Sequence, residues 1–436
     1  MPDFGEAGRR GADVRSDCWV RIEPRSKGGI RLALKSKVDV MYGKSIRKLV
    51  KRTLATFGID NAFVEMEDSG ALPFVIMARI EAAVKRLNPA EKIECLPELL
   101  ESAAYPTRKE RFRRSRLYLP GNEPKFIINA GIHRPDGVIL DLEDSVAPAV
   151  KHDALYLVRN ALRQIDFMGA ERMVRINQLP KGLAELDVLA GANVHMILIP
   201  KCETAEMVRE VDARINGSQS SSVVLLMPII ESCLGVFNAL EIARASPNVA
   251  ALTIGLEDYT ADLGTQRTLE ARESFWARSQ VVNAARAAGV QPIDTVFSDV
   301  NDMAGLRQSV MEAKGMGYEG KGCIHPRQIE PIHEAFAPAE AEIERARKIV
   351  IAYKEAENKG LGAVALGSKM IDKPVVARAR RTVDLAIRMG RLAADWDSFL
   401  DPPITPIPTD SGSRIQKPLQ SVMSADKSEP GTGGGK

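Results

Sequence analysis

Eight short apolar runs between residues 116 and 326 each end in polar or charged residues. Strands that are buried on both faces appear as continuous Val, Ile and Leu runs, and parallel strands need crossovers of about a dozen residues or more. The spacing leaves room for one helix after each run, which predicts an α/β fold, a (β/α)8 TIM barrel. The predicted strands lie in RLYLPGN (116–122), DGVILDLED (136–144), RMVRIN (172–177), HMILIPK (195–201), VVLLMPIIES (223–232), ALTIGLED (251–258), QPIDTVFSD (291–299) and GKGCIHP (320–326).

Shorter patterns flank the barrel. The N-terminal part alternates strand-like runs (CWVRIEP, IRLALKSKV, AFVEMED) with two helical patterns, KSIRKLVKRTLATFG and PFVIMARIEAAVKRL, which predicts a small α+β domain. The C-terminal end is rich in Pro, Ser, Thr and Gly and is predicted to be disordered. The predicted divisions are an α+β domain (1–90), a linker with a short helix (91–112), the barrel (113–335), a helical or lid segment (336–395) and the disordered tail (396–436).

Composition narrows the class of protein. Apolar residues make up 45% of the chain and charged residues 27%, as in ordinary soluble globular proteins. The net charge of +3 is too small to indicate nucleic-acid binding. No apolar stretch approaches the roughly 20 residues that span a bilayer. Five cysteines without a CxxC pair fit a reducing cytoplasm. The basic run 108–116 is open to two interpretations, a site for an anionic ligand or a solvated linker helix.

Charged residues end nearly every predicted barrel strand. Barrel enzymes carry their chemistry at the carboxyl ends of the strands, and a buried strand has no structural need for a charge there. The pattern therefore indicates an enzyme. The residues at these ends are Asp141, Glu143, Arg175, Lys201, Glu231, Glu257, Asp258 and His325.

Two acidic ends lie on neighbouring strands. Glu231 ends the fifth strand and Glu257-Asp258 the sixth, and adjacent strands are about 4.8 Å apart, so their carboxylates can share one hard cation such as Mg²⁺. Arg175 on the third strand can clamp a substrate carboxylate or form a structural ion pair with Asp141 or Glu143. For His325 we favour a structural role over a catalytic one.

Taken together, the motifs resemble the citrate lyase beta subunit family, part of the HpcH/HpaI aldolase/citrate lyase group. The resemblance covers roughly residues 113–390 and rests on RRSRLYLPGNEPKFI, DGVILDLEDSVAP, VRIN, LIPKCET, IIESCLGVFNALEIA, GLEDYTADLG, AARAAGVQPIDTVFSDVND, GKGCIHPRQI and SKMIDKPVV. It implies that Glu231 and Asp258 bind Mg²⁺ and that Arg175 binds substrate. It also implies that Asp372 of the M-x-D-x-P motif closes over the site from a neighbouring subunit. Other acidic residues at strand ends would position the side chains that bind Mg²⁺ and substrate. These are Asp141, Glu143 and Glu257.

The N-terminal domain resembles the citrate lyase gamma subunit, an acyl carrier protein, through GADVRSDCWVRIEP, MYGKSIRKLV and EDSGALPFVIMARIEAAV. The family carrier attaches a phosphoribosyl-dephospho-CoA group to a serine two residues before the motif aspartate, here Asp17. That position is Arg15, and the nearest hydroxyl is Ser16. Either Ser16 carries the group, or the domain is a relic and the barrel uses free CoA thioesters.

The resemblance implies a magnesium-dependent carbon–carbon lyase that cleaves a 3-hydroxy acyl thioester. The leading candidate is a citryl thioester, cleaved to oxaloacetate and an acetyl thioester. One alternative is a malyl-CoA or citramalyl-CoA lyase, or a related thioesterase or synthase, acting on free CoA thioesters. Another is a catalytically silent carrier or scaffold. Expected partners are the thioester substrate, further copies in a trimer or hexamer, and an alpha-type transferase subunit, but neither nucleic acid nor a membrane.

Overall fold

The computed structural model describes residues 3–217, 223–358, 363–366 and 369–397. Residues 1–338 form one compact unit, and a second unit begins at Ala339. The predicted disordered tail lies outside the described residues from residue 398 onward. The finer domain boundaries given above stay predictions.

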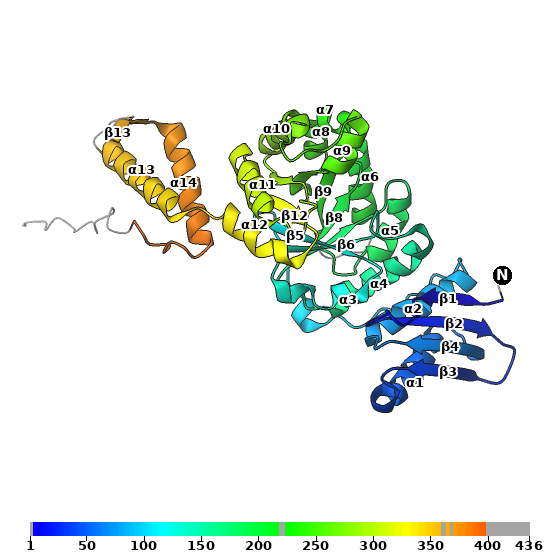
Figure 1. The fold of residues 1–436 in the computed structure, drawn as a ribbon. Helices are drawn as coiled ribbons and strands as arrows, with labels where there is room; N and C mark the ends of the chain where they lie inside the picture. The colour runs from blue at the N-terminus through cyan, green and yellow to red at the C-terminus, as the bar shows by residue number, and fades with distance from the viewer. Residues whose placement is uncertain (1–2, 218–222, 359–362, 367–368, 398–436) are drawn as a thin grey trace, which may run out of the picture. The chain divides into compact units, whose positions relative to one another are not determined.

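Eight parallel strands close into a barrel, which confirms the predicted fold (Figure 1). The strands follow one another around the barrel in chain order, and the last, β12, pairs with the first, β5. Each predicted apolar run overlaps one of them, although β5 and β7 begin one residue before their runs. Their bounds are β5 Ser115–Pro120, β6 Gly137–Asp141, β7 Glu171–Arg175, β8 Met196–Ile199, β9 Leu225–Ile230, β10 Ala251–Ile254, β11 Gln291–Asp294 and β12 Gly320–Cys323.

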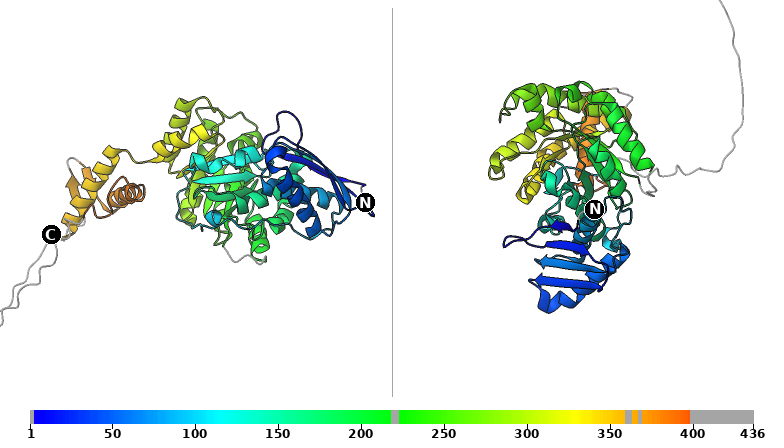
Figure 2. Two further views of the ribbon diagram at one scale, coloured as in Figure 1. Left: turned by 90° about the horizontal axis from the view of Figure 1, so that it is seen from below. Right: turned by 90° about the vertical axis from the view of Figure 1, so that its right-hand side faces the viewer.

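Helices cover the outside of the barrel (Figure 2). The α-helices are α3 Pro124–Ile127, α4 Lys151–Gln164, α5 Lys181–Leu189, α6 Ala205–Asn216, α7 Cys233–Phe237, α8 Ala239–Arg244, α9 Leu256–Leu263, α10 Arg272–Ala288, α11 Met303–Met316 and α12 Ile329–Phe336. Short 3-10 helices lie at η2 Ala130–His133, η3 Pro148–Val150 and η4 Pro326–Gln328.

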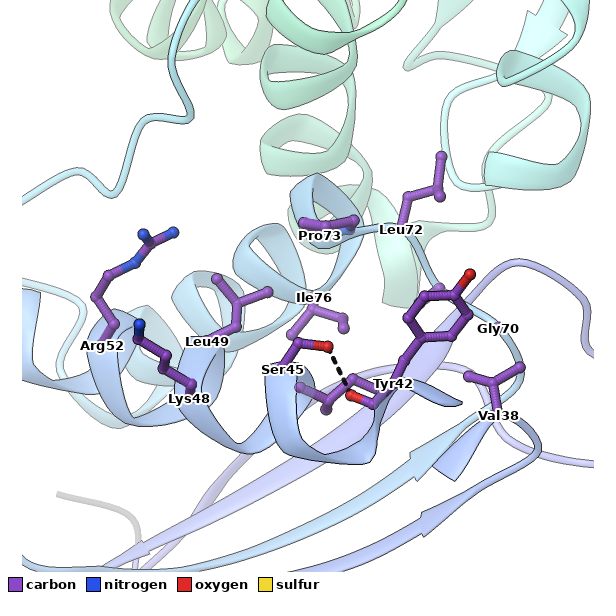
Figure 3. A pocket seen from close by; sticks show the side chains of 12 residues that line it. Val38, Tyr42, Ser45, Lys48, Leu49, Arg52, Gly70, Leu72, Pro73 and Ile76 are labelled. Carbon is purple, nitrogen blue, oxygen red and sulfur yellow. Dashed lines mark hydrogen bonds between the residues drawn. The ribbon is translucent and has the colours of Figure 1, made fainter. Parts of the chain in front are cut away.

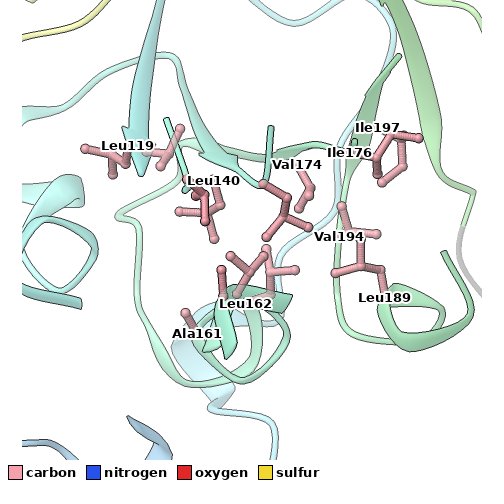
Figure 4. Close-up of a cluster of buried hydrophobic side chains, with 14 of the residues drawn as sticks. Leu119, Leu140, Ala161, Leu162, Val174, Ile176, Leu189, Val194 and Ile197 are labelled. Atoms are coloured by element: carbon pink, nitrogen blue, oxygen red, sulfur yellow. The ribbon is translucent and has the colours of Figure 1, made fainter. Parts of the chain in front are cut away.

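Alternate strand residues build two separate cores. On β6, Leu140 faces the helices and joins the large core between strands and helices (Figure 4), whereas Ile139 faces the barrel interior. The interior cluster includes Met173, Met196 and Met227. Because both faces of each strand are buried, the strands appear as continuous apolar runs in the sequence.

The N-terminal part forms a four-stranded sheet in the order β1-β2-β4-β3 with two helices. The elements are β1 Gly5–Gly8, β2 Cys18–Pro24, β3 Ile30–Ser36, α1 Asp39–Thr56, β4 Ala62–Asp68 and α2 Pro73–Leu87. The sequence pattern predicted all of these except β1, which has no apolar run and pairs only at the edge, with β2. Helix α1 begins at Asp39, earlier than the predicted Lys44. The sequence pattern missed this first turn because its Val40 and Met41 are exposed and do not continue the apolar face.

One buried ion pair and one buried hydrogen bond from an arginine fasten this N-terminal part to the barrel. Arg159 on α4 binds both carboxylate oxygens of Glu81 on α2, at 2.9 and 2.5 Å, and neither side chain is exposed to solvent. Arg79, also on α2, binds both oxygens of Asp17 at 2.9 Å and donates to the backbone oxygen of Asp153 on α4 at 3.3 Å. Helix α2 is thus buried between its own sheet and the barrel.

The segment predicted as a linker lies largely without regular structure. Its one helical turn is the 3-10 helix η1 Glu101–Ala103. The basic run at its end is not a solvated helix, because Arg113 pairs with buried Glu171 at 2.7 Å and Arg116 enters strand β5. The solvated-linker interpretation of residues 108–116 is therefore wrong for these two arginines.

The second unit has its own small core. Helix α13 Glu340–Asn358 precedes the antiparallel pair β13 Val364–Leu366 and β14 Lys369–Ile371, and α14 Lys373–Arg388 follows. Ile349, Val350 and Tyr353 on α13 are buried against α14 residues. Among the described residues, none of the helices is both long and apolar enough to cross a bilayer.

The Glu81–Arg159 pair gives a stability prediction. Glu81→Leu should lower the free energy of unfolding by about 3–5 kcal/mol, because it leaves the buried guanidinium with only the more distant, partly exposed carboxylate of Glu94, at 3.6 Å. The double variant Glu81→Leu/Arg159→Met should recover most of that loss, since it removes both charges. Chemical denaturation measures both.

An exposed ion pair serves as the control. Asp187 and Arg214 pair at 2.5 Å with both side chains 52% exposed, so Asp187→Ala should cost no more than about 1 kcal/mol. Equal destabilisation by the single and the double variant would contradict the assignment of the loss to unpaired charge.

Candidate functional site

A cavity of about 400 Å³ opens at the carboxyl ends of the barrel strands. Acidic, basic and small polar side chains line it together. Its lining includes Arg116, Tyr118, Asp141, Asp144, Ser145, Arg175, Glu231, Thr253, Gly255, Glu257, Asp258 and Thr295. The structure thus brings to one place most of the residues that the sequence placed at strand ends.

Glu231 follows the last residue of β9 and is only 6% exposed. Its Oε2 accepts a hydrogen bond from the backbone N–H of Lys201 at 3.2 Å. Burial raises the pKa of Glu231 to about 8, and the negative charges of Glu143 and Asp258 add to this. Gly255 lies against the carboxylate, since a Cβ there would come within 2.7 Å of Oε1. A small residue at 255 is therefore part of how the barrel admits this carboxylate.

Asp258 lies in the first turn of α9, directly after β10. Its Oδ1 pairs with the Lys201 ammonium at 2.9 Å, and both side chains are 39% exposed. Lys201 has a left-handed backbone with φ +46°, which turns the chain after β8 so that its N–H reaches Glu231 and its side chain reaches Asp258. One residue thus connects the two acidic groups.

Arg175 ends β7 and is held by acidic groups from β6. Its Nε and one Nη bind the two oxygens of Asp141 at 2.6 and 2.8 Å, and its other Nη pairs with Glu143 at 2.7 Å. Burial lowers the pKa of Arg175, but the hydrogen bonds and charge of Asp141 outweigh burial and raise it. Conversely, burial raises the pKa of Asp141, and Arg175 outweighs that and lowers it. The pair is therefore ionised.

The donor set of the cavity fits Mg²⁺. Glu231 and Asp258 offer carboxylate oxygens from adjacent strand ends, and Mg²⁺ commonly takes one or two protein carboxylates while keeping several waters. Among the described residues no group of three or more His, Cys, Asp or Glu side chains forms a metal-binding cluster. Burial, and after it the negative charge of Glu143 and Asp258, raises the pKa of Glu231, and a bound cation would favour the ionised carboxylate.

Other predicted residues lie further from this centre. Glu257 pairs with Arg267 at 2.6 Å and its side chain is 62% exposed. His325 accepts the backbone N–H of Arg327 at 3.1 Å and so caps the short helix η4, which agrees with a structural role. Asp372 belongs to the second unit, where its carboxylate accepts the N–H of Val375 at 3.2 Å and caps α14.

Ser16 lies in the turn before β2, with a left-handed φ of +56°, and is partly exposed. Its backbone N–H donates to the Ser69 oxygen at 3.0 Å. The neighbouring Asp17 is buried by its pair with Arg79, so this aspartate of the carrier motif has a structural task here.

The sequence did not single out the lining residues Tyr118 and Thr253, which face inward from strand middles rather than strand ends. Arg116 belonged to the basic run 108–116, for which an anionic ligand was one of two interpretations, and it opens the apolar run 116–122. A charge at the start of a buried strand is unusual.

A larger, mostly apolar cavity of about 550 Å³ lies in the N-terminal part, between α1 and the start of α2 (Figure 3). Leu49 and Ile76 point into it, and Ser45 donates a hydrogen bond to the Tyr42 backbone oxygen at 2.7 Å. Among its lining residues there is no carboxylate, histidine or cysteine, so acid–base chemistry favours the barrel mouth.

Comparisons with known proteins agree with this assignment. Residues 114–326 match the family model for HpcH/HpaI aldolase/citrate lyase. Residues 9–87 match an acyl carrier protein model described as the malonate decarboxylase delta subunit. The chain thus combines a barrel and a carrier-like domain, and each matches a separate family model.

Several known proteins align with this chain over nearly their whole length. The citrate lyase subunit beta of Leuconostoc mesenteroides subsp. cremoris is 39% identical over 284 residues, 64% of this chain and 94% of that protein. The mitochondrial citramalyl-CoA lyase of Mus musculus is 31% identical over 325 residues, 69% of this chain and 96% of that protein. A solved structure of CitE from Mycobacterium tuberculosis, in complex with magnesium, acetoacetate and coenzyme A, aligns with a TM-score of 0.54 at 28% identity, covering 64% of this chain and 99% of that one. The eight-stranded barrel, the acidic mouth and these similarities lead to one conclusion: the chain belongs to the HpcH/HpaI aldolase/citrate lyase family.

Proposed function

We propose that this chain is a magnesium-dependent lyase that breaks a carbon–carbon bond in a 3-hydroxy acyl thioester. The leading substrate is a citryl thioester, which would give oxaloacetate and an acetyl thioester. The observation that carries the proposal is the pair of carboxylates, Glu231 and Asp258, in one cavity with Arg175. Relatives described as citrate lyase and citramalyl-CoA lyase support the reaction class.

Glu231 and Asp258 would hold Mg²⁺ together with the substrate hydroxyl and its adjacent carboxylate. When bound, the ion acts as a Lewis acid that stabilises the oxygen of the forming ketone. Lys201 helps to position both ligands, through its N–H to Glu231 and its ammonium to Asp258. The backbone turn at Lys201 thus fixes the distance between two ligands that come from different strands.

Arg175 would orient the substrate. Its hydrogen bonds to Asp141 occupy two of its five N–H donors, and Glu143 lies in ion-pair contact with the other Nη, so N–H donors remain for a substrate oxygen. Because the two acids fix the guanidinium plane, little conformational entropy is lost when substrate binds. The structural ion pair and the substrate contact are therefore compatible roles.

The reaction needs a base and an acid. The base removes the proton of the 3-hydroxyl, the C2–C3 bond breaks as the ketone forms, and the bonding electrons pass to the thioester enolate. An acid then protonates the α-carbon of that enolate to give the acetyl thioester. We assign one of these proton transfers to Asp372, acting from a neighbouring subunit of a homo-oligomer, a trimer or a hexamer.

A second candidate function is the cleavage of free citramalyl-CoA or malyl-CoA. Arg15 at the expected attachment position favours it, since arginine forms no phosphodiester. A silent scaffold is disfavoured by the costly burial of Glu231, because a scaffold gains nothing from a carboxylate with a raised pKa. An alpha-type transferase partner is expected only if the carrier-like domain is loaded.

The proposed function first makes a prediction about the two metal ligands, Glu231 and Asp258. Glu231→Gln and Asp258→Asn should each lower Mg²⁺-dependent lyase activity by about 100-fold or more, since even partners of metal ligands cost 10–100-fold. Both substitutions keep the side-chain shape, and Glu231→Gln also removes a buried ionisable group, so the melting temperature should stay level or rise. Steady-state kinetics over a Mg²⁺ titration and thermal unfolding measure the two effects.

Asp262→Asn is the matched control, because Asp262 lies one turn beyond Asp258 on α9 and is exposed. It should leave activity within about threefold of the unaltered chain. Near-normal turnover of citryl and citramalyl thioesters by Glu231→Gln at limiting Mg²⁺ would refute the metal assignment.

A second prediction places Asp372 across a subunit boundary. Inactive Glu231→Gln and inactive Asp372→Asn chains, refolded together, should form about a quarter of their sites from two intact halves and regain part of the activity. Asparagine is also a good helix N-cap, so Asp372→Asn should leave α14 in place. Absence of recovery in verified mixed oligomers would place Asp372 outside catalysis in trans.

A third prediction tests the carrier. If Ser16 holds the prosthetic group, co-expression with a carrier-loading transferase should add one phosphoribosyl-dephospho-CoA mass, which Ser16→Ala abolishes and Ser69→Ala retains. Intact-protein mass spectrometry reads this directly. An unmodified chain whose Ser16→Ala variant cleaves free CoA thioesters at the normal rate would leave the soluble-CoA reaction as the function.

A further inference from the structure

Arg116 is a buried arginine without an acidic partner in the interior of the barrel. It is the second residue of β5 and is 1% exposed. Its guanidinium donates to the Met227 sulfur at 3.1 Å, to the Thr253 hydroxyl at 3.3 Å and to the backbone oxygen of Asp294 at 3.2 Å. Its Nε has no hydrogen-bond partner among the described residues.

Most other buried arginines of the described chain have a carboxylate in ion-pair contact. Arg79, Arg113, Arg159 and Arg278 are each paired in this way. Arg172 also lacks a carboxylate. It lies near the amino end of β7, away from the mouth, where oxygens of Tyr105 and Asn193 hold it.

The three partners of Arg116 are weaker. A thioether sulfur is a poor acceptor, and the hydroxyl and the carbonyl carry no net charge. Burial lowers the pKa of Arg116, as expected for a cation in an apolar interior without a contacting anion. The positive charge of Arg116 is therefore not neutralised by any of the three groups that its guanidinium contacts.

Arg116 belongs to the lining of the proposed active-site cavity. Its partner Thr253 lies two residues before Gly255, and Thr253 pairs in register with Ile229, which lies two residues before Glu231. Because side chains on one face of a strand recur every second residue, the guanidinium lies one interior layer below the Glu231 carboxylate. It forms the floor of the cavity.

The two basic groups described above the floor each already contact a carboxylate. Arg175 contacts Asp141 and Glu143, and Lys201 contacts Asp258. Of the two arginines in the described lining, only Arg116 contacts no carboxylate. An anionic group that reaches the floor would therefore meet one uncompensated positive charge.

The candidate substrates differ in the group that could reach it. In each, the carbon that bears the hydroxyl also bears a carboxylate and the methylene group of the thioester. Its fourth substituent is a carboxymethyl group in a citryl thioester, a methyl group in citramalyl and hydrogen in malyl. The second carboxylate of the citryl group is the anion that the other two lack.

We propose that Arg116 binds this second carboxylate and makes the site selective for thioesters with a carboxymethyl group on the hydroxyl-bearing carbon. The inference rests on the proposed function and deepens it. A charge-assisted contact at the floor, with the hydroxyl and first carboxylate at Glu231 and Asp258, would fix the substrate at two points. The thioester would then extend toward the open mouth.

The test compares two substrates in one variant series. With the full chain and Mg²⁺, Arg116→Met should lower kcat/KM for citryl-CoA by about 100-fold or more and change that for citramalyl-CoA by less than about threefold. Arg116→Lys should retain part of the citryl activity, because it keeps the charge and loses the planar fork. Oxaloacetate and pyruvate formation report the two reactions. An equal fall with both substrates, or a native preference for citramalyl-CoA, would overturn the inference.

A binding measurement keeps the two proposals separable. Oxaloacetate should bind the unaltered chain in the presence of Mg²⁺ at least about tenfold more tightly than pyruvate, and Arg116→Met should remove that difference. Calorimetry measures this without turnover, so it also applies if neither thioester is cleaved, an outcome that would count against the proposed function alone. Equal affinities for oxaloacetate and pyruvate in the unaltered chain would refute the role of Arg116.

Discussion

The contact of Arg175 with Asp141 and Glu143 is the interaction on which the barrel mouth depends. Several carboxylates share a cavity of about 400 Å³, and their mutual repulsion would raise their pKa values and favour neutral acids. Arg175 offsets two of them, and Lys201 offsets Asp258. Glu231 has no basic side chain in ion-pair contact among the described residues, and burial together with the neighbouring carboxylates raises its pKa to about 8. The mouth therefore combines a pre-organised guanidinium with one acidic position that a cation would stabilise.

The barrel could be predicted because its strands are buried on both faces and its charges lie where those strands end. These two features fixed the eight strands and placed Glu231, Asp258 and Arg175 at one mouth. Features that depend on pairing rather than on local pattern were missed. Strand β1 has four residues and no apolar run, and it exists because the edge of β2 offers hydrogen bonds. The start of α1 was missed because its first turn is exposed.

Arginine was the hardest residue to place from sequence. A run of basic residues is usually solvated, yet Arg113 and Arg116 are buried within four positions of each other. They differ in what surrounds them, since Glu171 neutralises Arg113, whereas Arg116 faces a thioether, a hydroxyl and a carbonyl. Partners of this kind are separated by more than 50 residues in the chain, so only the closed barrel reveals them.

The seat of the carrier-like domain on the barrel has a consequence for how acyl groups could move. Carrier domains on flexible linkers visit distant active sites by diffusion of the whole domain. Here helix α2 is buried between its own sheet and the barrel, and separating the two would expose its apolar side chains and break both the Glu81–Arg159 pair and the Arg79–Asp153 contact. The domain is thus a fixed platform rather than a shuttle. Any acyl group attached to the domain would move only within the reach of its own prosthetic arm. The attachment point of that arm would keep a constant position relative to the barrel.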